Sequence, residues 1–289
     1  MAILMKGAPV AAAICARTTA QMQKLAEQGV TPCLAILRVG ENGGDVAYER
    51  SAVKRCAGLG IRTETVALPA DASEEALLAE IDRVNRSEEI HGCLLLRPLP
   101  RHMDEYRLCQ ALDPQKDVDC ITAGSMSFVF TGLGEGFWPC TPQACLEILD
   151  YYGVGLRGAK AAVIGRSLVV GRPLAMLLQA RDATVTLCHS RTKDLAALCR
   201  EQDILISAAG HIGTVDGSFV REGQVVLDVG TNVGSDGKLT GDVVFDSVEG
   251  LVGAITPVPG GVGAVTTSVL AAHVVQAAAR QLGVDIAGV

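Results

Sequence analysis

The chain has 289 residues, enough for two ordinary domains, each with a substantial core. The formal net charge is -7, and no lysine- or arginine-rich segment is interleaved with aromatic residues, so nucleic acid is not an expected partner. No uninterrupted apolar run approaches the roughly 18 residues needed to cross a bilayer, so we expect a soluble protein that does not bind a membrane.

The ten cysteines include no CxxC pair, and most stand where a small apolar residue would serve. This pattern favours buried free thiols over a disulfide or metal framework, so we predict no metal site and a reducing, cytoplasmic location. Near the N-terminus, Lys6 precedes an alanine-rich run as in a signal peptide. The apolar positions continue at helical spacing towards Gly29, which favours a folded first helix.

In the first part of the chain, predicted helices alternate with short apolar strands. Such alternation is typical of an α/β unit with a mostly parallel sheet. The predicted elements are helices over 8–29, 46–59, 74–85 (capped by Ser73) and 103–112, and strands over 33–39, 63–68 and 92–96.

A second alternating series follows residues 113–139, which lack sustained periodicity and suggest a linker or a lid. Thr141 and Pro142 fit the cap and first turn of a helix that runs to about 152. The remaining predicted elements are strands over 160–164, 184–188, 204–207 and 225–229, a candidate last strand over 241–245, helices near 174–180 and 193–199, and a closing helix over 264–282 that can pack back on the first domain.

Residues 160–173, KAAVIGRSLVVGRP, predict a buried strand, a turn and the N-terminus of a helix. The strand breaks at Gly165, and Gly171 with Pro173 opens the helix. Unpaired N–H groups and the helix dipole at such a terminus favour a phosphate. The spacing differs from the common GxGxxG, so the glycine pattern alone leaves a structural turn and a cofactor loop about equally open.

The residues after the second strand of this series favour NADP over NAD. An NAD site usually carries Asp or Glu about 20 residues beyond the glycine turn, where it binds the ribose 2′-hydroxyl. Here Ser190 and Arg191 follow the strand, and Arg166 lies in the turn itself. Hydroxyl and guanidinium donors suit a 2′-phosphate, although a solvated surface arginine remains the alternative for Arg191.

Several stretches, in this order, resemble one family nearly end to end. They are DPQKDVD (113–119), PCTP (139–142), VIGRSLVVGRP, CHSRT, LDVGTN (227–232), GDVVF and ITPVPGGVG (255–263). The order and content of these motifs are similar to those of the methylenetetrahydrofolate dehydrogenase/methenyltetrahydrofolate cyclohydrolase family.

The resemblance implies an α/β protein of two domains with mostly parallel sheets: a folate-binding domain (1–147 plus 265–289) and a Rossmann-like NADP-binding domain (148–264). It also implies a homodimer that binds tetrahydrofolate one-carbon derivatives in the cleft between the domains. Tyr48 and Asp119 are then the catalytic and substrate-binding residues. Further substrate contacts are Pro259, Gly260 and Gly261, and the cofactor contacts are Gly165, Arg166, Ser167, Gly171, Ser190, Arg191, Thr231 and Thr266.

Two departures from the family's pattern bear on its chemistry, and a third, at Ala264 and Val265 after the GGVG stretch, is minor and leaves Thr266 in place. The family places a catalytic lysine four residues after the tyrosine, and that position is Ala52 here. At about 100° per residue, Tyr48 and residue 52 share a helix face, whereas Lys54 points roughly 200° away and is not expected to substitute. Leu96 stands where the family has a glutamine that hydrogen-bonds this lysine, and Arg97 replaces it only if the backbone turns.

These departures bear differently on the family's two reactions. Hydride transfer from 5,10-methylenetetrahydrofolate needs mainly orientation, whereas hydrolysis of the methenyl product needs proton transfer, commonly worth about 100- to 10,000-fold. We therefore predict an oxidoreductase, an NADP-dependent methylenetetrahydrofolate dehydrogenase, with weak or absent cyclohydrolase activity. The alternatives are a fully bifunctional enzyme, a non-catalytic folate- and nucleotide-binding pseudoenzyme, and a non-folate dehydrogenase on the same plan.

Overall fold

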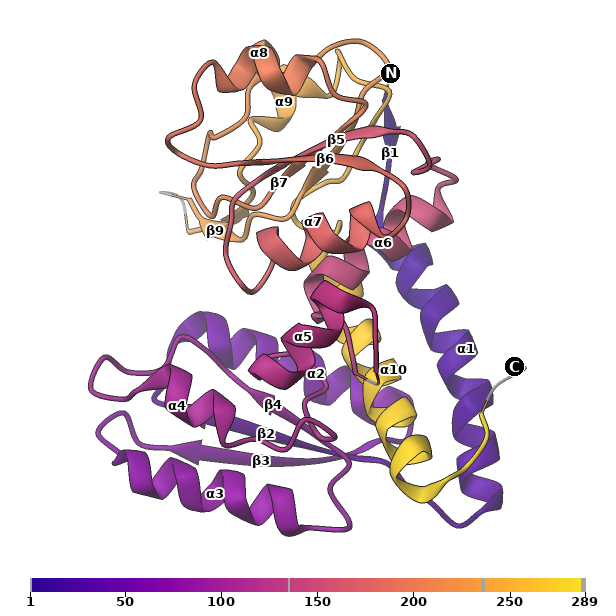
Figure 1. Ribbon diagram of the computed structural model, residues 1–289, viewed down its shortest axis with the longest axis vertical. Coiled ribbons are helices and arrows are strands. Elements are labelled where there is room, and N and C mark those ends of the chain that lie inside the picture. Colours follow the sequence, from indigo (N-terminus) through magenta and orange to yellow (C-terminus); the bar gives the residue numbers. More distant parts are fainter. Residues whose placement is uncertain (1, 135, 235–236, 287–289) are drawn as a thin grey trace. The chain divides into compact units, whose positions relative to one another are not determined.

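The computed structural model describes residues 2–134, 136–234 and 237–286. It divides into two compact units (Figure 1): a C-terminal unit, Met1–Ala12 with Thr141–Thr266, and an N-terminal unit, Ala13–Cys140 with Thr267–Val289. The predicted domains, 1–147 with 265–289 and 148–264, differ from these units mainly in the assignment of the first twelve residues. The domain limits themselves stay a prediction.

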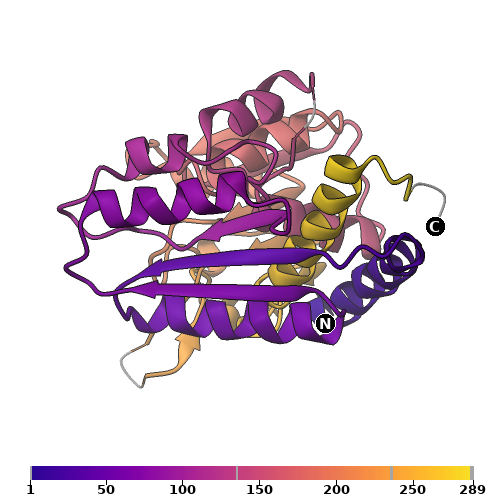
Figure 2. The same ribbon diagram turned by 90° about the horizontal axis from the view of Figure 1, so that it is seen from below.

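The N-terminal unit is built on a parallel three-stranded sheet of order β3-β2-β4. The central strand β2 (Cys33–Val39) is buried at every position because it has a neighbour on each edge and a helix on each face. Helix α2 covers one face, and α3 and α4 cover the other (Figure 2). The remaining bounds are β3 Arg62–Leu68, β4 Gly92–Leu95, α2 Gly43–Gly58, α3 Glu74–Arg86, α4 Glu105–Gln110 and α5 Ala123–Thr131.

The period of two along β2 decides which residues enter the core beneath α3 and α4. Cys33, Leu37 and their alternate neighbours join the cluster that also contains Leu77 and Ile81 of α3. The predicted cap of α3 is confirmed, because the Ser73 side chain accepts a hydrogen bond from the Ala76 N–H at 3.3 Å.

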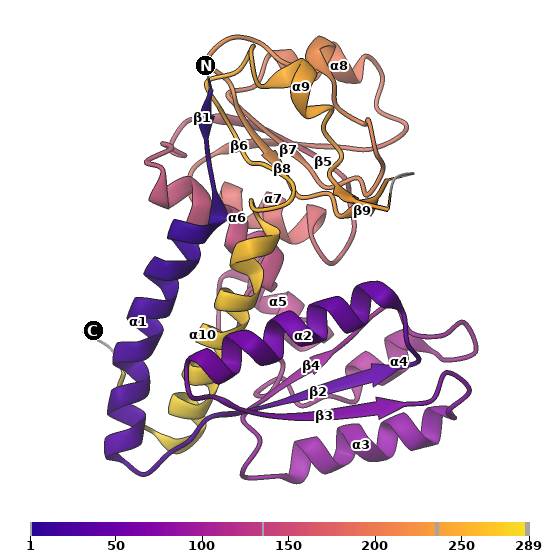
Figure 3. The same cartoon turned by 180° about the vertical axis from the view of Figure 1, so that it is seen from behind.

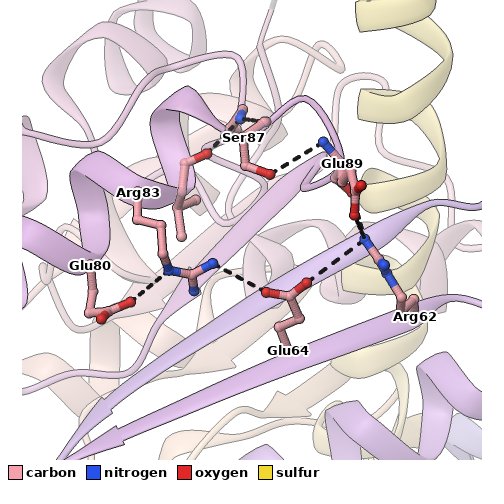
Figure 4. A network of polar contacts seen from close by, with 8 residues as sticks. Arg62, Glu64, Glu80, Arg83, Ser87 and Glu89 are labelled. Atoms are coloured by element: carbon pink, nitrogen blue, oxygen red, sulfur yellow. Dashed lines mark hydrogen bonds and ion pairs between the residues drawn. The ribbon is translucent and has the colours of Figure 1, made fainter.

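The outer edge of β3 carries charged side chains that pair with α3 and the following loop (Figure 4). Arg83 bonds Glu80 at 2.8 Å and Glu64 at 3.3 Å, and Arg62 bonds Glu89 at 3.0 Å. Such exposed pairs contribute little to stability, about 0 to 1 kcal/mol each. Their charges do make this edge a poor template for pairing with another strand.

The C-terminal unit contains a six-stranded parallel sheet of order β1-β11-β8-β7-β5-β6, with β1 at one edge (Figure 3). From β5 the chain passes to β6 on one side and then to β7 on the other. This reversal is the topological switch point at which such sheets bind ligands. The strands are β1 Ile3–Leu4, β5 Lys160–Ile164, β6 Thr184–Cys188, β7 Ile204–Ser207, β8 Val225–Asp228 and β11 Ala254–Ile255.

Helices α6 and α7 cover one face of this sheet, and α8 and α9 cover the other (Figure 1). Their bounds are α6 Cys140–Tyr151, α7 Gly171–Gln179, α8 Leu195–Arg200 and α9 Phe245–Val248, with a 3-10 turn η1 at Gly217–Phe219 and an antiparallel pair of β9 Asn232–Val233 with β10 Leu239–Thr240. The long helices α1 (Gly7–Glu27) and α10 (Gly263–Leu282) each have residues in both units.

The predicted α/β architecture with mostly parallel sheets is confirmed, and the closing helix contributes its residues from Thr267 onward to the N-terminal unit as expected. The interpretation of 113–139 as a linker or a lid missed α5, which is capped by the Thr122 side chain and is followed by Gly132 with φ 67°. The strand expected over 241–245 was wrong: Val243 forms one isolated bridge to Val215, and α9 begins at Phe245.

Within the described ranges, no helix is long and apolar enough to cross a membrane. The same residues contain no group of three or more His, Cys, Asp or Glu side chains arranged to hold a metal ion.

Candidate functional site

Two glycines shape the turn between β5 and α7. Gly165 has φ 118°, a conformation that favours glycine, and a Cβ there would collide with the carbonyl oxygen of Ala208. A Cβ on Gly171 would collide with the carbonyl of Gly165 itself. The predicted strand, turn and helix are therefore confirmed, and the loops after β5 and β7 meet in backbone contact.

The N-terminus of α7 opens from this turn without a side-chain cap at Val170. Ser167 supports the turn, because its hydroxyl accepts from the Val170 N–H at 3.1 Å and its carbonyl accepts from the Arg172 N–H at 3.0 Å. Arg166 and Ser167 are exposed beside it. The helix dipole and the exposed Arg166 guanidinium beside it together suit a phosphate group.

The loop after β6 holds the predicted 2′-phosphate residues at the neighbouring strand end. A tight turn forms because the Arg191 N–H donates to His189 Nδ1 at 3.1 Å and the Thr192 N–H donates to the His189 carbonyl at 2.8 Å. Ser190 and Arg191 are exposed on this turn. Since Gly165 N–H donates to the Cys188 carbonyl at 3.0 Å, the two loops start from adjacent positions on the sheet.

The other predicted cofactor and substrate residues of the C-terminal unit follow β8 and β11. Thr231 is exposed just beyond β8, and Pro259 and Gly260 are exposed beyond β11, where the Gly260 carbonyl accepts from the Gly7 N–H at 2.8 Å. Gly261 is buried, and the Thr266 hydroxyl donates to the Val262 carbonyl at 3.2 Å. Because all six strands are parallel, these loops leave the same edge of the sheet as the glycine turn.

In the N-terminal unit, one face of α2 carries Tyr48, Ala52 and Cys56. Ala52 and Cys56 are fully buried and Tyr48 is half-buried, whereas Lys54 is exposed. The inference that Lys54 points away from this face is therefore confirmed. The position of the family's lysine is occupied by a methyl group that can neither carry charge nor transfer a proton.

Asp119 lies close to Tyr48 in this unit. The Asp119 carboxylate accepts from the Cys140 N–H at 3.2 Å. Burial raises the pKa of Asp119, opposed by hydrogen bonds from Cys140 and by the charge of Arg97. The pKa of the Tyr48 phenol is also raised, first by burial and then by Cys140 and the Asp119 carboxylate. The structure thus brings together the two residues predicted to bind substrate in this unit.

Leu96 and Arg97 directly follow β4. β4 ends at Leu95, and Leu96 is buried with its N–H donating to the Leu37 carbonyl at 2.9 Å. The Arg97 guanidinium lies 3.8 Å from a carboxylate oxygen of Glu105 in α4. Arg97 is therefore engaged with α4, while its charge still reaches Asp119.

Sequence reasoning missed two supporting groups. One is Cys140, whose thiol donates to the Val118 carbonyl at 3.5 Å and lies 3.7 Å from His273 Nδ1. The other is the pair of buried carboxylates Asp228 and Asp242. The only signal for them was membership of the quoted motifs PCTP, LDVGTN and GDVVF, from which no role for these side chains followed.

Comparison with known proteins finds the same two-part organisation. Residues 5–119 match the family described as tetrahydrofolate dehydrogenase/cyclohydrolase, catalytic domain, and residues 139–282 match the NAD(P)-binding domain of that family. The bifunctional protein FolD of Clostridioides difficile is 46% identical over 278 residues, which cover 96% of this chain and 97% of that protein.

Solved structures give the same grouping. The bifunctional FolD methylenetetrahydrofolate dehydrogenase/cyclohydrolase from Campylobacter jejuni has a TM-score of 0.94 at 36% identity, covering 97% of this chain and 99% of that chain. The methylenetetrahydrofolate dehydrogenase-cyclohydrolase of Trypanosoma brucei, solved with NADP cofactor and an inhibitor, has a TM-score of 0.92 at 35% identity, covering 97% and 98%.

Proposed function

The chain belongs to the tetrahydrofolate dehydrogenase/cyclohydrolase family, and on that premise we propose that it oxidises 5,10-methylenetetrahydrofolate to 5,10-methenyltetrahydrofolate with NADP, while its cyclohydrolase activity is weak or absent. The observation that carries the second part is the pair Ala52 and Leu96, two buried apolar side chains where the family's pattern has a lysine and a glutamine.

The cofactor part is supported by the fit of the C-terminal unit to a dinucleotide. The glycine turn packs so closely that a Cβ at Gly165 or Gly171 would collide with backbone carbonyls, and α7 begins beside it without a side-chain cap at Val170. Arg166, Ser167 and the first turn of α7 would hold the linking phosphates, and Ser190 with Arg191 would hold the 2′-phosphate. NADP supplies the hydride acceptor, as its presence in the Trypanosoma brucei relative suggests.

The dehydrogenase step does not require a general acid or base from the protein. A hydride leaves the one-carbon bridge with its electron pair, and a lone pair of the substrate's own nitrogen stabilises the resulting cation. Asp119 would accept from N–H groups of the pterin, and Tyr48 would pack against or hydrogen-bond the folate. Pro259, Gly260 and Gly261 would complete the contacts, so that orientation is the main contribution of the chain.

The hydrolase step has stricter requirements, because water must add and a ring nitrogen must leave. Ala52 and Leu96 cannot donate or accept a proton. Tyr48, with its raised pKa, stays protonated at neutral pH and is a poor base. The methenyl product should therefore leave the enzyme unhydrolysed.

An assay of both steps on the purified protein tests this proposal. Methenyltetrahydrofolate should accumulate in proportion to NADPH formed, with only the uncatalysed rate of conversion to 10-formyltetrahydrofolate. Rapid enzyme-dependent conversion would instead support the fully bifunctional alternative, with Arg97 as the replacement cation, since its charge already opposes the rise that burial causes in the pKa of Asp119. Binding of folate and NADP without turnover would support the pseudoenzyme.

The family resemblance also underlies our proposal of a cytoplasmic homodimer. Light scattering on the eluting protein distinguishes a dimer from a monomer of 30.1 kDa.

A further inference from the structure

The fully buried side chain of Asp242 accepts hydrogen bonds from two separate loops of the C-terminal unit. Oδ2 accepts from the Ser207 hydroxyl at 3.0 Å, the Ala209 N–H at 2.7 Å and the Gly210 N–H at 3.1 Å. Oδ1 accepts from the His211 N–H at 2.9 Å and from Asn232 Nδ2 at 3.0 Å. One carboxylate therefore joins the loop after β7 to the loop after β8.

A second buried carboxylate fixes the backbone of Asp242. Asp228, at the end of β8, accepts from the Asp242 N–H at 3.0 Å and the Val243 N–H at 2.9 Å. Two glycines make room for this arrangement, because a Cβ on Gly230 would collide with the Asp242 carboxylate and one on Gly241 with the Asp228 carboxylate. The position of Asp242 is thus constrained from several sides.

The loop that Asp242 holds forms one side of the switch point. The Ala208 carbonyl, which begins this loop, occupies the space that a Cβ of Gly165 would need. A shift of residues 208–211 would therefore move the backbone directly against the glycine turn. The bond to Asn232 extends the same constraint to the residue next to Thr231.

We propose that Asp242 is a positioning residue for the dinucleotide, acting through the loops after β7 and β8. The proposal rests on NADP being the cofactor. An acceptor-only carboxylate suits this role because all five partners are donors, whereas an amide would turn an NH2 group towards some of them. With an amide at position 242, a buried N–H group of the loop after β7 would lose its acceptor, and the loop would move to satisfy it.

The test is titration calorimetry of the purified protein with NADP alone, which needs no turnover. Asp242→Asn should weaken NADP binding roughly 10- to 100-fold relative to the unsubstituted protein, as expected when one or two buried hydrogen bonds are lost. In steady-state assays the same variant should raise the KM for NADP while leaving the KM for the folate substrate within about twofold, a division that general destabilisation would not produce.

Asp203→Asn is the matched control. The Asp203 carboxylate accepts from the Lys160 N–H at 2.9 Å and pairs with Arg221 at 3.0 Å, at the opposite, amino-terminal edge of the same sheet. It should bind NADP like the unsubstituted protein. If Asp242→Asn does not fold, Asn232→Ala removes one partner from outside the core and should weaken binding about threefold to tenfold.

Normal NADP affinity in a folded Asp242→Asn protein overturns the positioning role, as does normal affinity in Asn232→Ala if the first variant is unfolded. Failure of the unsubstituted protein to bind NADP overturns the proposed cofactor instead.

Discussion

The two units carry their functional groups in different ways. In the C-terminal unit, the candidate cofactor site is made of backbone: glycines in close contact, an uncapped helix terminus, and buried carboxylates that hold loop N–H groups. In the N-terminal unit, the hydrolytic chemistry of the family depends on two side chains, and both positions are now apolar. Replacing a projecting side chain leaves the backbone intact, whereas altering the glycine turn forces the backbone to move. One reaction of a two-reaction family can therefore be lost without loss of the fold.

The largest expected effect comes from restoring the side chains. The double substitution Ala52→Lys with Leu96→Gln should raise enzyme-dependent hydrolysis of methenyltetrahydrofolate by about 100- to 10,000-fold, the usual size of general acid–base assistance. The measurement is the first-order decay of the methenyl compound with and without protein.

Ala52→Met with Leu96→Met is the control for this gain, because it adds volume at the same buried positions without adding a proton-transfer group. If the Lys/Gln variant hydrolysed the methenyl compound no faster than the Met/Met control or the unsubstituted protein, positions 52 and 96 would not determine the cyclohydrolase activity.

Next in size is the effect of breaking the backbone site. Gly171→Ala places a methyl group against the Gly165 carbonyl and should lower the free energy of unfolding by about 2 to 3 kcal/mol, as overpacking of a rigid region does. NADP affinity should fall with it. Gly155→Ala in the same unit has open space around its Cβ and should change neither quantity, which urea unfolding and calorimetry can check.

A smaller effect is expected at the loop after β6. Ser190→Asp combined with Arg191→Ala removes a hydroxyl and a guanidinium and adds a charge that repels the 2′-phosphate, so the ratio of kcat/KM for NADP to that for NAD should fall about 10- to 100-fold. Since the glycine turn is untouched, NAD itself should be used at least as well as before. An unchanged ratio would remove Ser190 and Arg191 from the site.

The sequence predicted most of the fold because apolar runs, glycines and helical periodicity act over a few neighbouring residues. The run of apolar residues before Gly165 specified β5, and helix geometry alone placed Lys54 on the exposed side of α2. Strands β1 and β11 were not predicted, because a strand of two residues is too short to show an alternating pattern. The role of Asp242 could not be predicted, since it depends on residues 31 to 35 positions earlier that the sheet brings beside it.

The smallest expected effect concerns acid stability, where two buried groups, one in each unit, respond in opposite directions. Burial lowers the pKa of His273 in the N-terminal unit to about 4, below its ordinary 6.5. The unfolded chain therefore binds the extra proton between those values, and stability falls as pH decreases through that window. Burial raises the pKa of Asp228 in the C-terminal unit to about 6 from 3.8, so the folded protein takes up that proton first and stability rises as pH decreases from about 6.

Between pH 7 and pH 5 these contributions are about 2 kcal/mol of loss from His273 and about 1 kcal/mol of gain from Asp228, so they cancel in part. His273→Gln removes the loss while leaving an amide that can donate to the Val118 carbonyl, the group 2.8 Å from Nδ1. Urea unfolding at both pH values should then show this variant gaining about 2 kcal/mol relative to the unsubstituted protein on acidification, whatever its stability at pH 7. An identical pH slope in the two proteins would mean that His273 takes up its proton equally in the folded and unfolded states, and that it does not oppose Asp228.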